Sequence, residues 1–293
     1  MVLTERDREI LRQVYLFRLL TREQIERLLF PPDKGQDHFT KTSKVRKRLK
    51  LLYHHGYLER IPVPVGQGLW AWRPVYRLGQ EGAALIAAEL GLTTRQLTYW
   101  GKSDDADHRH SEVSLLFIHH TLAINDVRIA ITLAALTKGY QLEKWIDETQ
   151  LKRDEMKDYV SVIAGNGHGA RVPVIPDAYF ALHLGDRRAH FFLELDRATM
   201  STKRWKTRIQ AYRAYAESGK YQARYKTRSL RVLTVTTTPQ RLESLRQTTF
   251  QAGGGDLFWF TTIGEVMANT VLNVPIWRLA NDASDGMRNP LIA

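Results

Sequence analysis

Cysteine is absent from this chain of 293 residues, and its absence removes several chemistries. Without thiols the protein cannot form a disulfide, a cysteine-bound zinc site or a cysteine nucleophile. No apolar run nears the roughly 18 residues that a membrane-spanning helix requires. The N-terminal segment MVLTERDREI carries acids early and lacks the apolar core of a secretion signal. These absences predict a cytoplasmic protein without a membrane partner.

Acidic residues are also scarce relative to basic ones. The chain has 43 Lys and Arg against 31 Asp and Glu, which gives a net charge of +12. Such a surplus favours a polyanionic partner, and nucleic acid is the expected one when no membrane segment is present. A hydrophobic fraction of 43% with ten Pro indicates folded structure. The length fits two domains.

The first hundred residues have the pattern of a winged helix-turn-helix. Thr4 and Thr21 each precede acidic residues and an apolar stripe, which predicts two capped helices. A third helix is expected within TKTSKVRKRLKLLYHHGYLER, where Val45, Leu49 and Leu52 would form the buried stripe. Strand-like segments at 57–65 and 71–78, joined by Gly-Gln-Gly, would form the wing, and a closing helix is expected over 80–90.

The third predicted helix is strongly basic, with no acid between Phe39 and Leu58. The third helix of a winged helix normally enters the major groove of DNA, so its basic side chains are predicted to contact DNA. They are Lys44, Arg46, Lys47, Arg48 and Lys50. The alternative is a solvated face on a winged helix that binds protein. We predict a DNA-binding domain over 1–100, a polar linker over 101–110 and a second domain over 111–293.

The second domain is predicted to be α/β, making the whole chain α+β. A long helix is expected over 111–136, strands over 141–151, 172–184 and 189–196, a helix over 199–217, a strand over 231–238, a helix after Pro239 and a last strand in DLFWFTT. The order αβββαβ is the common core of restriction-endonuclease-like nucleases.

Carboxylates gather at the ends of two of these strands. Glu194 and Asp196 are two residues apart on one strand, so their side chains share a face, and Asp177 opens the neighbouring strand. The three carboxylates are therefore expected to converge. Converging carboxylates bind a hard cation, here Mg²⁺ or Mn²⁺. Glu148, placed on the first strand, is a further candidate ligand, with Asp147 an equally placed rival. The alternative is that these acids pair with basic residues of the following helix.

His120 falls on the apolar face of the long helix, where it is either a catalytic candidate or a satisfied core residue.

Between Arg197 and Arg231 the chain carries eleven basic residues and a single acid, Glu217. Phosphate contacts would relieve the repulsion among these charges, so Lys203, Arg204 and Arg208 are predicted to contact DNA. The alternative is a solubilising face. Interleaved aromatic residues could stack on bases of locally single-stranded DNA, or pack against the sheet. They are Trp205, Tyr212, Tyr215 and Tyr221. Tyr215 or Tyr212 is also a candidate nucleophile.

Several strings along the chain share their order and spacing with a known family. They are LTERDREIL, LTREQIERLLF, HHTLAIND, WIDETQL, PDAYFAL, FFLELDRAT and the helix ending in IQAYRAY. In these strings the chain resembles the replication-relaxation family of plasmid and mobile-element proteins. The resemblance implies a winged helix followed by a PD-(D/E)xK nuclease core, and a role in plasmid replication, DNA relaxation or mobilisation.

The nuclease motif is matched only in part. By the resemblance, Asp177 corresponds to the Asp of the Pro-Asp element and Glu194 to the first acid of (D/E)xK. Asp196 stands where the motif has Lys. Lys206 or Lys203 on the next helix could replace that Lys, or cleavage could be lost.

Two functions therefore follow from the sequence. The first is an Mg²⁺-dependent DNA endonuclease, nickase- or relaxase-like, that the winged helix directs to double-stranded DNA. The second is a non-catalytic DNA-binding replication initiator or repressor with a degenerate nuclease core. Either protein could act as a homodimer.

Overall fold

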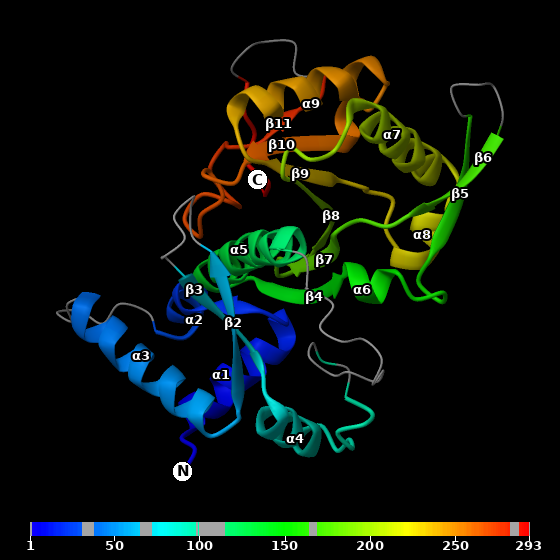
Figure 1. The fold of residues 1–293 in the computed structure, drawn as a ribbon. Coiled ribbons are helices and arrows are strands. Elements are labelled where there is room, and N and C mark those ends of the chain that lie inside the picture. The colour runs from blue at the N-terminus through cyan, green and yellow to red at the C-terminus, as the bar shows by residue number, and fades with distance from the viewer. Residues whose placement is uncertain are drawn as a thin grey trace. The chain divides into compact units, whose positions relative to one another are not determined.

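The computed structural model describes residues 2–30, 38–64, 72–97, 99, 115–163, 169–281 and 287–292. The protein is mixed α/β, as the sequence predicts, and its contacts divide the chain into two compact units, Met1–Ile129 and Ala130–Ala293 (Figure 1). The division falls within helix α5, Leu115–Thr137. The predicted linker at 101–110 and the tip of the predicted wing lie outside the described residues.

The first unit contains helices and a small sheet. In chain order these are α1 (Glu5–Phe17), β1 (Leu20–Thr21), α2 (Arg22–Leu29), α3 (His38–His54), β2 (Leu58–Pro64), β3 (Trp72–Leu78) and α4 (Gln80–Glu89). Strands β2 and β3 form an antiparallel hairpin, and the sheet order is β1-β3-β2. The apolar stripes expected from the sequence are buried, including Val45, Leu49 and Leu52 of α3.

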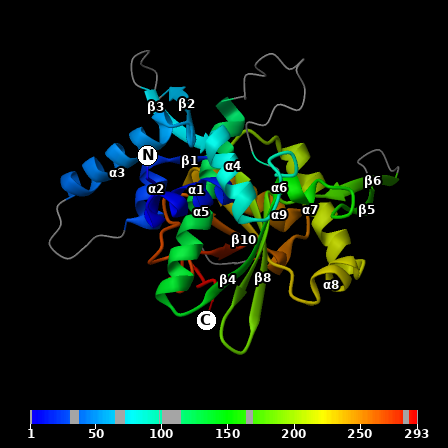
Figure 2. The same cartoon turned by 90° about the horizontal axis from the view of Figure 1, so that it is seen from below.

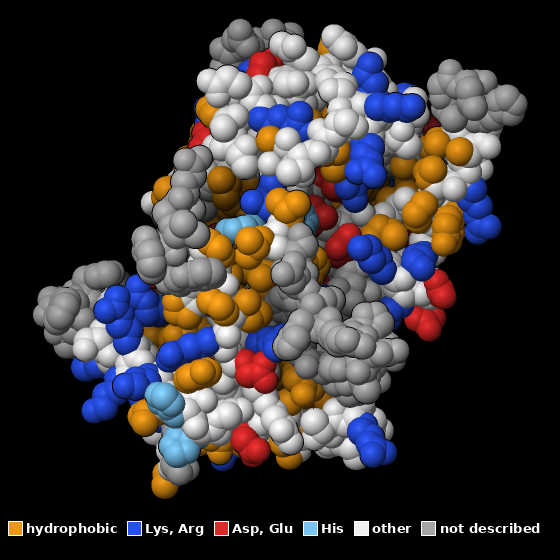
Figure 3. Space-filling model, viewed as in Figure 1, with side chains coloured by type: hydrophobic (Ala, Val, Ile, Leu, Met, Phe, Trp, Pro, Cys, Tyr) orange, Lys and Arg blue, Asp and Glu red, His pale blue; other side chains and the backbone are white. Residues whose placement is uncertain are grey.

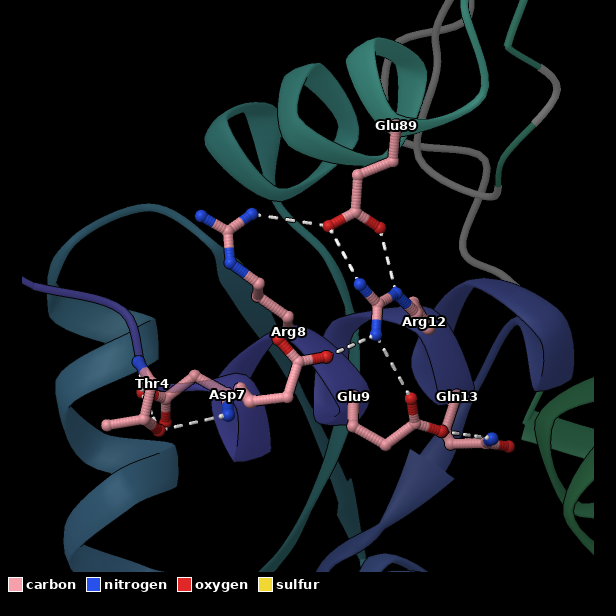
Figure 4. Close-up of polar contacts among 8 residues, drawn as sticks. Thr4, Asp7, Arg8, Glu9, Arg12, Gln13 and Glu89 are labelled. Carbon is pink, nitrogen blue, oxygen red and sulfur yellow. Dashed lines mark hydrogen bonds and ion pairs between the residues drawn. The ribbon is translucent and has the colours of Figure 1, made fainter.

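Both predicted N-caps are present, and Asp7, which completes the capping box of the first, also binds Arg48 of α3. The Thr4 hydroxyl accepts from the Asp7 amide, and the Asp7 carboxylate accepts from the Thr4 amide at 2.7 Å, so the two form a capping box (Figure 4). Asp7 is fully buried and also accepts from Arg48 Nε at 2.8 Å. Burial alone would raise the pKa of Asp7, but the hydrogen bonds from Arg48 and Thr4 outweigh it and the pKa is lowered.

We expect Asp7→Asn to lower the free energy of unfolding by about 2 kcal/mol, because it removes the charge that holds Arg48 and weakens the cap. Urea denaturation measures the change. Glu5→Gln, which alters an exposed side chain of the same helical turn, is the control and should stay within about 0.5 kcal/mol. Equal losses in the two variants would contradict the assigned role of Asp7.

Helix α4 is joined to α1 by a network around Glu89. Its carboxylate accepts from Arg12 Nε at 2.9 Å and from Arg8 Nη1 at 3.2 Å (Figure 4). These arginines are partly exposed, so the network fixes geometry more than it stabilises the fold.

The first part of α5 packs within the first unit. The buried Asn125 amide donates to the carbonyl oxygens of Phe17 at 3.1 Å and Leu19 at 2.6 Å. Gln24 donates to Asp126 Oδ1 at 3.0 Å. These bonds satisfy the carbonyl groups where α1 ends, and they attach α5 to the helices before it.

The second unit is built on a six-stranded mixed sheet. After α5 come β4 (Gln141–Asp147), α6 (Glu148–Leu151), β5 (Asp158–Ile163), β6 (Gly169–Val174), β7 (Ala178–His183), β8 (Arg188–Asp196), α7 (Thr202–Glu217), α8 (Lys220–Tyr225), β9 (Val232–Thr236), α9 (Pro239–Gln251), η1 (Gly255–Leu257), β10 (Phe258–Thr262) and β11 (Arg278–Leu279). The strand order is β11-β10-β9-β8-β7-β4, with β8, β9 and β10 parallel and the other pairs antiparallel.

An aromatic core lies between this sheet and its helices. Phe192 of β8 and Phe258 of β10 contact the rings of α7, including Tyr212, and Trp205 Nε1 donates to Thr249 Oγ1 of α9 at 2.9 Å. Figures 1 and 2 show α7 and α9 beside each other against the sheet. The four aromatic residues of the basic region are all buried in this core, so they pack against the sheet: Trp205, Tyr212, Tyr215 and Tyr221.

Two expectations about strands are corrected, and the structure adds one strand. The strand predicted over 141–151 ends at Asp147, because the Asp147 carboxylate accepts from the Gln150 amide at 2.9 Å and caps α6. The strand predicted over 172–184 is two strands, β6 and β7. They are separated around Pro176, which has no amide proton for a ladder. Strand β5 was not predicted, and it pairs with β6 in a separate two-stranded sheet beside α7 (Figures 1 and 2).

Candidate functional site

The predicted carboxylates lie on neighbouring strands, Glu194 and Asp196 at the end of β8 and Asp177 directly before β7. Asp177, Glu194 and Asp196 are 7%, 2% and 4% exposed. Asp177 Oδ2 accepts from the Leu195 amide at 2.7 Å, and the Asp177 amide donates to the Leu193 carbonyl oxygen at 3.0 Å. The side chain and the backbone of Asp177 are thus both tied to β8.

Glu194 is bonded to two side chains of α7. Its Oε1 lies 3.0 Å from Arg208 Nε and accepts a hydrogen bond from the Tyr212 hydroxyl. Arg208 Nη2 donates in turn to the Ile175 carbonyl oxygen at 2.6 Å. This is the ion pair with the following helix that the sequence left open as an alternative.

Arg208 is the cation paired with Glu194, and the charges of other carboxylates also act on it. Burial alone would lower the pKa of Arg208, but the charges of Glu194, Asp177 and Glu148 outweigh it and the pKa is raised. The guanidinium therefore stays charged and supplies positive charge to the carboxylate cluster. Arg208 is predicted from the sequence to contact phosphate, and the structure also gives it a partner, Glu194.

Asp196 is held by a different arginine, Arg241 of α9. Arg241 Nε and Nη2 donate to its two oxygens at 2.7 Å and 2.9 Å, and Thr236 Oγ1 donates at 3.0 Å. Burial alone would raise the pKa of Asp196, but the hydrogen bonds and charge of Arg241 outweigh it and the pKa is lowered. Such a bidentate pair is the strong form of a carboxylate–arginine contact.

The Asp196–Arg241 pair makes stability dependent on acid pH. Because the pKa of Asp196 is below its ordinary 3.8 in the folded protein, its contribution is present above that value and is lost as the pH falls through the folded pKa. We expect Asp196→Asn to cost about 2 kcal/mol at pH 7 and less below pH 3.8. Urea denaturation across this range measures it. A cost that stays constant with pH would contradict the pairing.

The sequence predicts Glu148 on the first strand, but in the structure it is the first residue of α6. It is half-buried and pairs with Lys152 Nζ at 2.7 Å. Asp147, its rival, is the N-cap of that helix. The string Asp-Glu-Thr-Gln carried this information, because an Asp three residues before a Gln is the signature of a helix start.

A cavity of about 480 Å³ adjoins the cluster, and its lining includes Glu148, Lys152, Arg204 and Arg208. Lys203 and Lys206, the predicted substitutes for the missing motif Lys, are exposed on α7 and do not line it. Arg204, which lines the cavity, is exposed. His120 is half-buried on α5 in the first unit, whereas the carboxylates belong to the second.

The carboxylates as arranged do not fit a metal ion. The Glu194 carboxylate is paired with Arg208 and accepts a hydrogen bond from Tyr212. The Asp196 carboxylate accepts from Arg241, and one oxygen of Asp177 accepts from a backbone amide. Within the described residues, no group of three or more Asp, Glu, His or Cys side chains is placed to hold an ion.

The two candidate nucleophilic tyrosines are buried. The Tyr212 hydroxyl donates to Glu194 and the Tyr215 hydroxyl donates to Asp158. Burial and the neighbouring carboxylates raise the pKa of both hydroxyl groups, which disfavours the phenolate that would attack a phosphodiester.

The predicted DNA-binding residues of α3 lie mostly at the surface. Lys44, Arg46, Lys47 and Lys50 are exposed, whereas Arg48 is half-buried against Asp7. No ion pair joins Arg46, Lys47 or Lys50 to any carboxylate that the structure describes. Figure 3 shows Lys and Arg side chains gathered over α3.

Among the described helices, none combines the length and apolar character needed to cross a membrane.

The chain is thus a mixed α/β protein with a basic helix in its N-terminal unit and a sheet domain in which buried Glu194 and Asp196 are paired with arginines. Comparison with known families identifies the family to which the chain belongs. The sequence pattern described as replication-relaxation matches residues 11–230, more than half of the chain. The chain therefore belongs to the replication-relaxation family, and this membership supports a role in the replication or relaxation of plasmids or mobile elements. No curated protein and no solved structure matches the chain.

Proposed function

We propose that this protein binds double-stranded DNA through α3 and acts in plasmid or mobile-element replication as a non-catalytic initiator or repressor. The observation that carries the proposal is the outer face of α3. Arg46, Lys47 and Lys50 are exposed there, opposite the buried stripe, without a carboxylate partner among the described residues. Neighbouring like charges repel each other, and phosphates of a DNA backbone would relieve that repulsion.

The elements around α3 support a winged helix-turn-helix. Helices α1 and α2 precede it, and the antiparallel hairpin of β2 and β3 follows it. In this class of domain the third helix enters the major groove and the hairpin contacts the flanking backbone. The Arg48–Asp7 pair would fix α3 on α1 so that the remaining basic residues face outward.

The carboxylate cluster supports a scaffold role for the second unit. Glu194 and Asp196 already have cationic partners, and those partners are α7 and α9 side chains that hold the helices to the sheet. Acids used in this way stabilise packing. The Asp at position 196, in place of the family motif's Lys, fits the same role.

A metal-dependent nicking enzyme is the second candidate, and one observation favours it. The charges of Asp177, Glu194 and Glu148 all act on Arg208, beside a cavity open to a ligand. Metal binding would require Arg208 to leave this position.

The proposal is tested with labelled duplex fragments of a replicon that encodes the protein, using fluorescence anisotropy at several salt concentrations. Arg46→Gln should weaken binding, and Lys138→Gln, an exposed cation outside α3, should not. Equal affinity of the two variants would reject α3 as the interface.

A further inference from the structure

A second cavity of about 310 Å³ lies at the other end of β8 from the carboxylates. Its walls come from separate segments of the second unit. Arg187 and Arg188 belong to the turn between β7 and β8 and to the start of β8, Arg231 directly precedes β9, and Trp259 lies on β10. Residues 290–292 close it. Neither the nuclease motif nor the basic face of α3 contributes to it.

The cavity is cationic. Three arginines line it, and no Asp or Glu is among the described residues of its wall. Arg188 is balanced by Glu143, whose Oε2 lies 2.7 Å from its Nε. Arg231 has no carboxylate within ion-pair distance in the described part of the chain; its Nη1 donates to the Leu291 carbonyl oxygen at 3.1 Å.

Arg231 is also the most desolvated of the three. It is half-buried, and its guanidinium carbon lies 5.2 Å from the ring centre of Trp259 and 5.8 Å from that of Phe191. Burial and the nearby charge of Arg187 lower the pKa of Arg231, so a bound anion would relieve both effects. A partly buried guanidinium without an acid is costly, and a ligand phosphate offsets that cost.

The aromatic side chains give the cavity a second kind of surface. Phe192, Val232 and Phe258 are paired across the sheet and face the aromatic core, so the residues next to them, Phe191 and Trp259, face the opposite side. The Trp259 indole is half-buried, and its Nε1 donates to the Asp256 carbonyl oxygen at 3.2 Å, which orients the ring. Planar rings beside arginines suit an aromatic base with a phosphate.

We propose that this cavity binds one nucleotide at the end of a single DNA strand, with its phosphate on Arg187 and Arg231 and its base against Trp259. The volume lies at the lower end of the roughly 300–1,000 Å³ typical of ligand pockets, which suits one nucleotide. The lining residues belong to the second unit and α3 to the first, so the two sites are tested with different variants. A free mononucleotide has the same chemistry, and the experiment distinguishes the two sources.

The probe is pentathymidylate with a 5′-phosphate and a 3′-fluorophore, followed by anisotropy. We expect Arg231→Gln to weaken binding by about tenfold or more, because a charge-assisted phosphate contact is lost. Arg228→Gln is the matched control. Arg228 is exposed, precedes Arg231 by three residues and does not line the cavity, so the affinity of this variant for the probe should change less than about twofold. If Arg231→Gln fails to fold, Arg187→Gln at an exposed position replaces it, and this variant should also bind the probe more weakly than Arg228→Gln does.

Competition identifies the source of the ligand. Displacement by unlabelled phosphorylated pentathymidylate, but weakly by thymidine monophosphate or inorganic phosphate, supports a strand end. Equal displacement by thymidine monophosphate supports the nucleotide pocket and assigns it to a free nucleotide. No binding of the probe, or equal loss in Arg231→Gln and Arg228→Gln, overturns the proposal. Arg46→Gln should leave probe binding intact, so failure of duplex binding is scored separately.

Discussion

Replacing Glu194 with Ala is expected to lower the free energy of unfolding by about 3 kcal/mol. The substitution leaves Arg208 and the buried Tyr212 hydroxyl without their acceptor, and a buried charge that loses its partner is costly. Urea denaturation measures the change, with Glu217→Ala on the exposed side of α7 as the control, expected within about 0.5 kcal/mol.

The sign of this effect separates two arrangements of the carboxylates in the metal-free protein. In a metal site that awaits its ion, carboxylates repel one another, so the loss of Glu194 would leave the metal-free protein equally or more stable. In the arginine-paired arrangement the loss destabilises. A double-mutant cycle of Glu194→Gln with Arg208→Met should give a coupling energy of about 1 kcal/mol or more, and additive effects would contradict a direct pair.

Removing three charges from α3 is the second large change. We expect the combined substitutions Arg46→Gln, Lys47→Gln and Lys50→Gln to weaken duplex binding about a hundredfold at moderate salt, at roughly 1 kcal/mol for each contact. The slope of log affinity against log salt should also fall by about 2.7, since each lost phosphate contact removes about 0.9.

The control for this variant removes the same charge elsewhere. Lys138→Gln, Lys226→Gln and Arg228→Gln change three exposed cations outside α3, so net charge is matched while the predicted interface is kept. Its affinity and salt slope should stay close to those of the unaltered protein. If both triple variants lose affinity to the same degree, DNA binding is a property of net charge and α3 is not its interface.

Local signals predicted the parts of this fold that depend on nearby residues. Thr4 and Thr21 begin helices because each caps a helix with a residue three positions on, a pattern visible in the sequence. Strand alternation likewise predicted that Glu194 and Asp196 share a face. Asp147 shows the limit of local signals, because the same capping pattern occurs there within a segment whose other residues favour a strand.

Partners distant in sequence were beyond such reasoning. Arg241 binds Asp196 from 45 residues away, and no spacing rule links them. Arg48 and Asp7 are separated by 41 residues, so no local spacing predicts that this basic residue pairs with the buried Asp7. The β5–β6 hairpin packs against α7, where the Tyr215 hydroxyl donates to Asp158, 57 residues away.

The most direct test of the arginine-paired, DNA-binding account uses a supercoiled replicon that encodes the protein, incubated with it in Mg²⁺ or Mn²⁺ and analysed for nicks. We predict binding of the plasmid without cleavage, and the same result for Asp177→Ala. A mapped nick that depends on the divalent ion and disappears in Asp177→Ala would contradict the account and establish the enzyme.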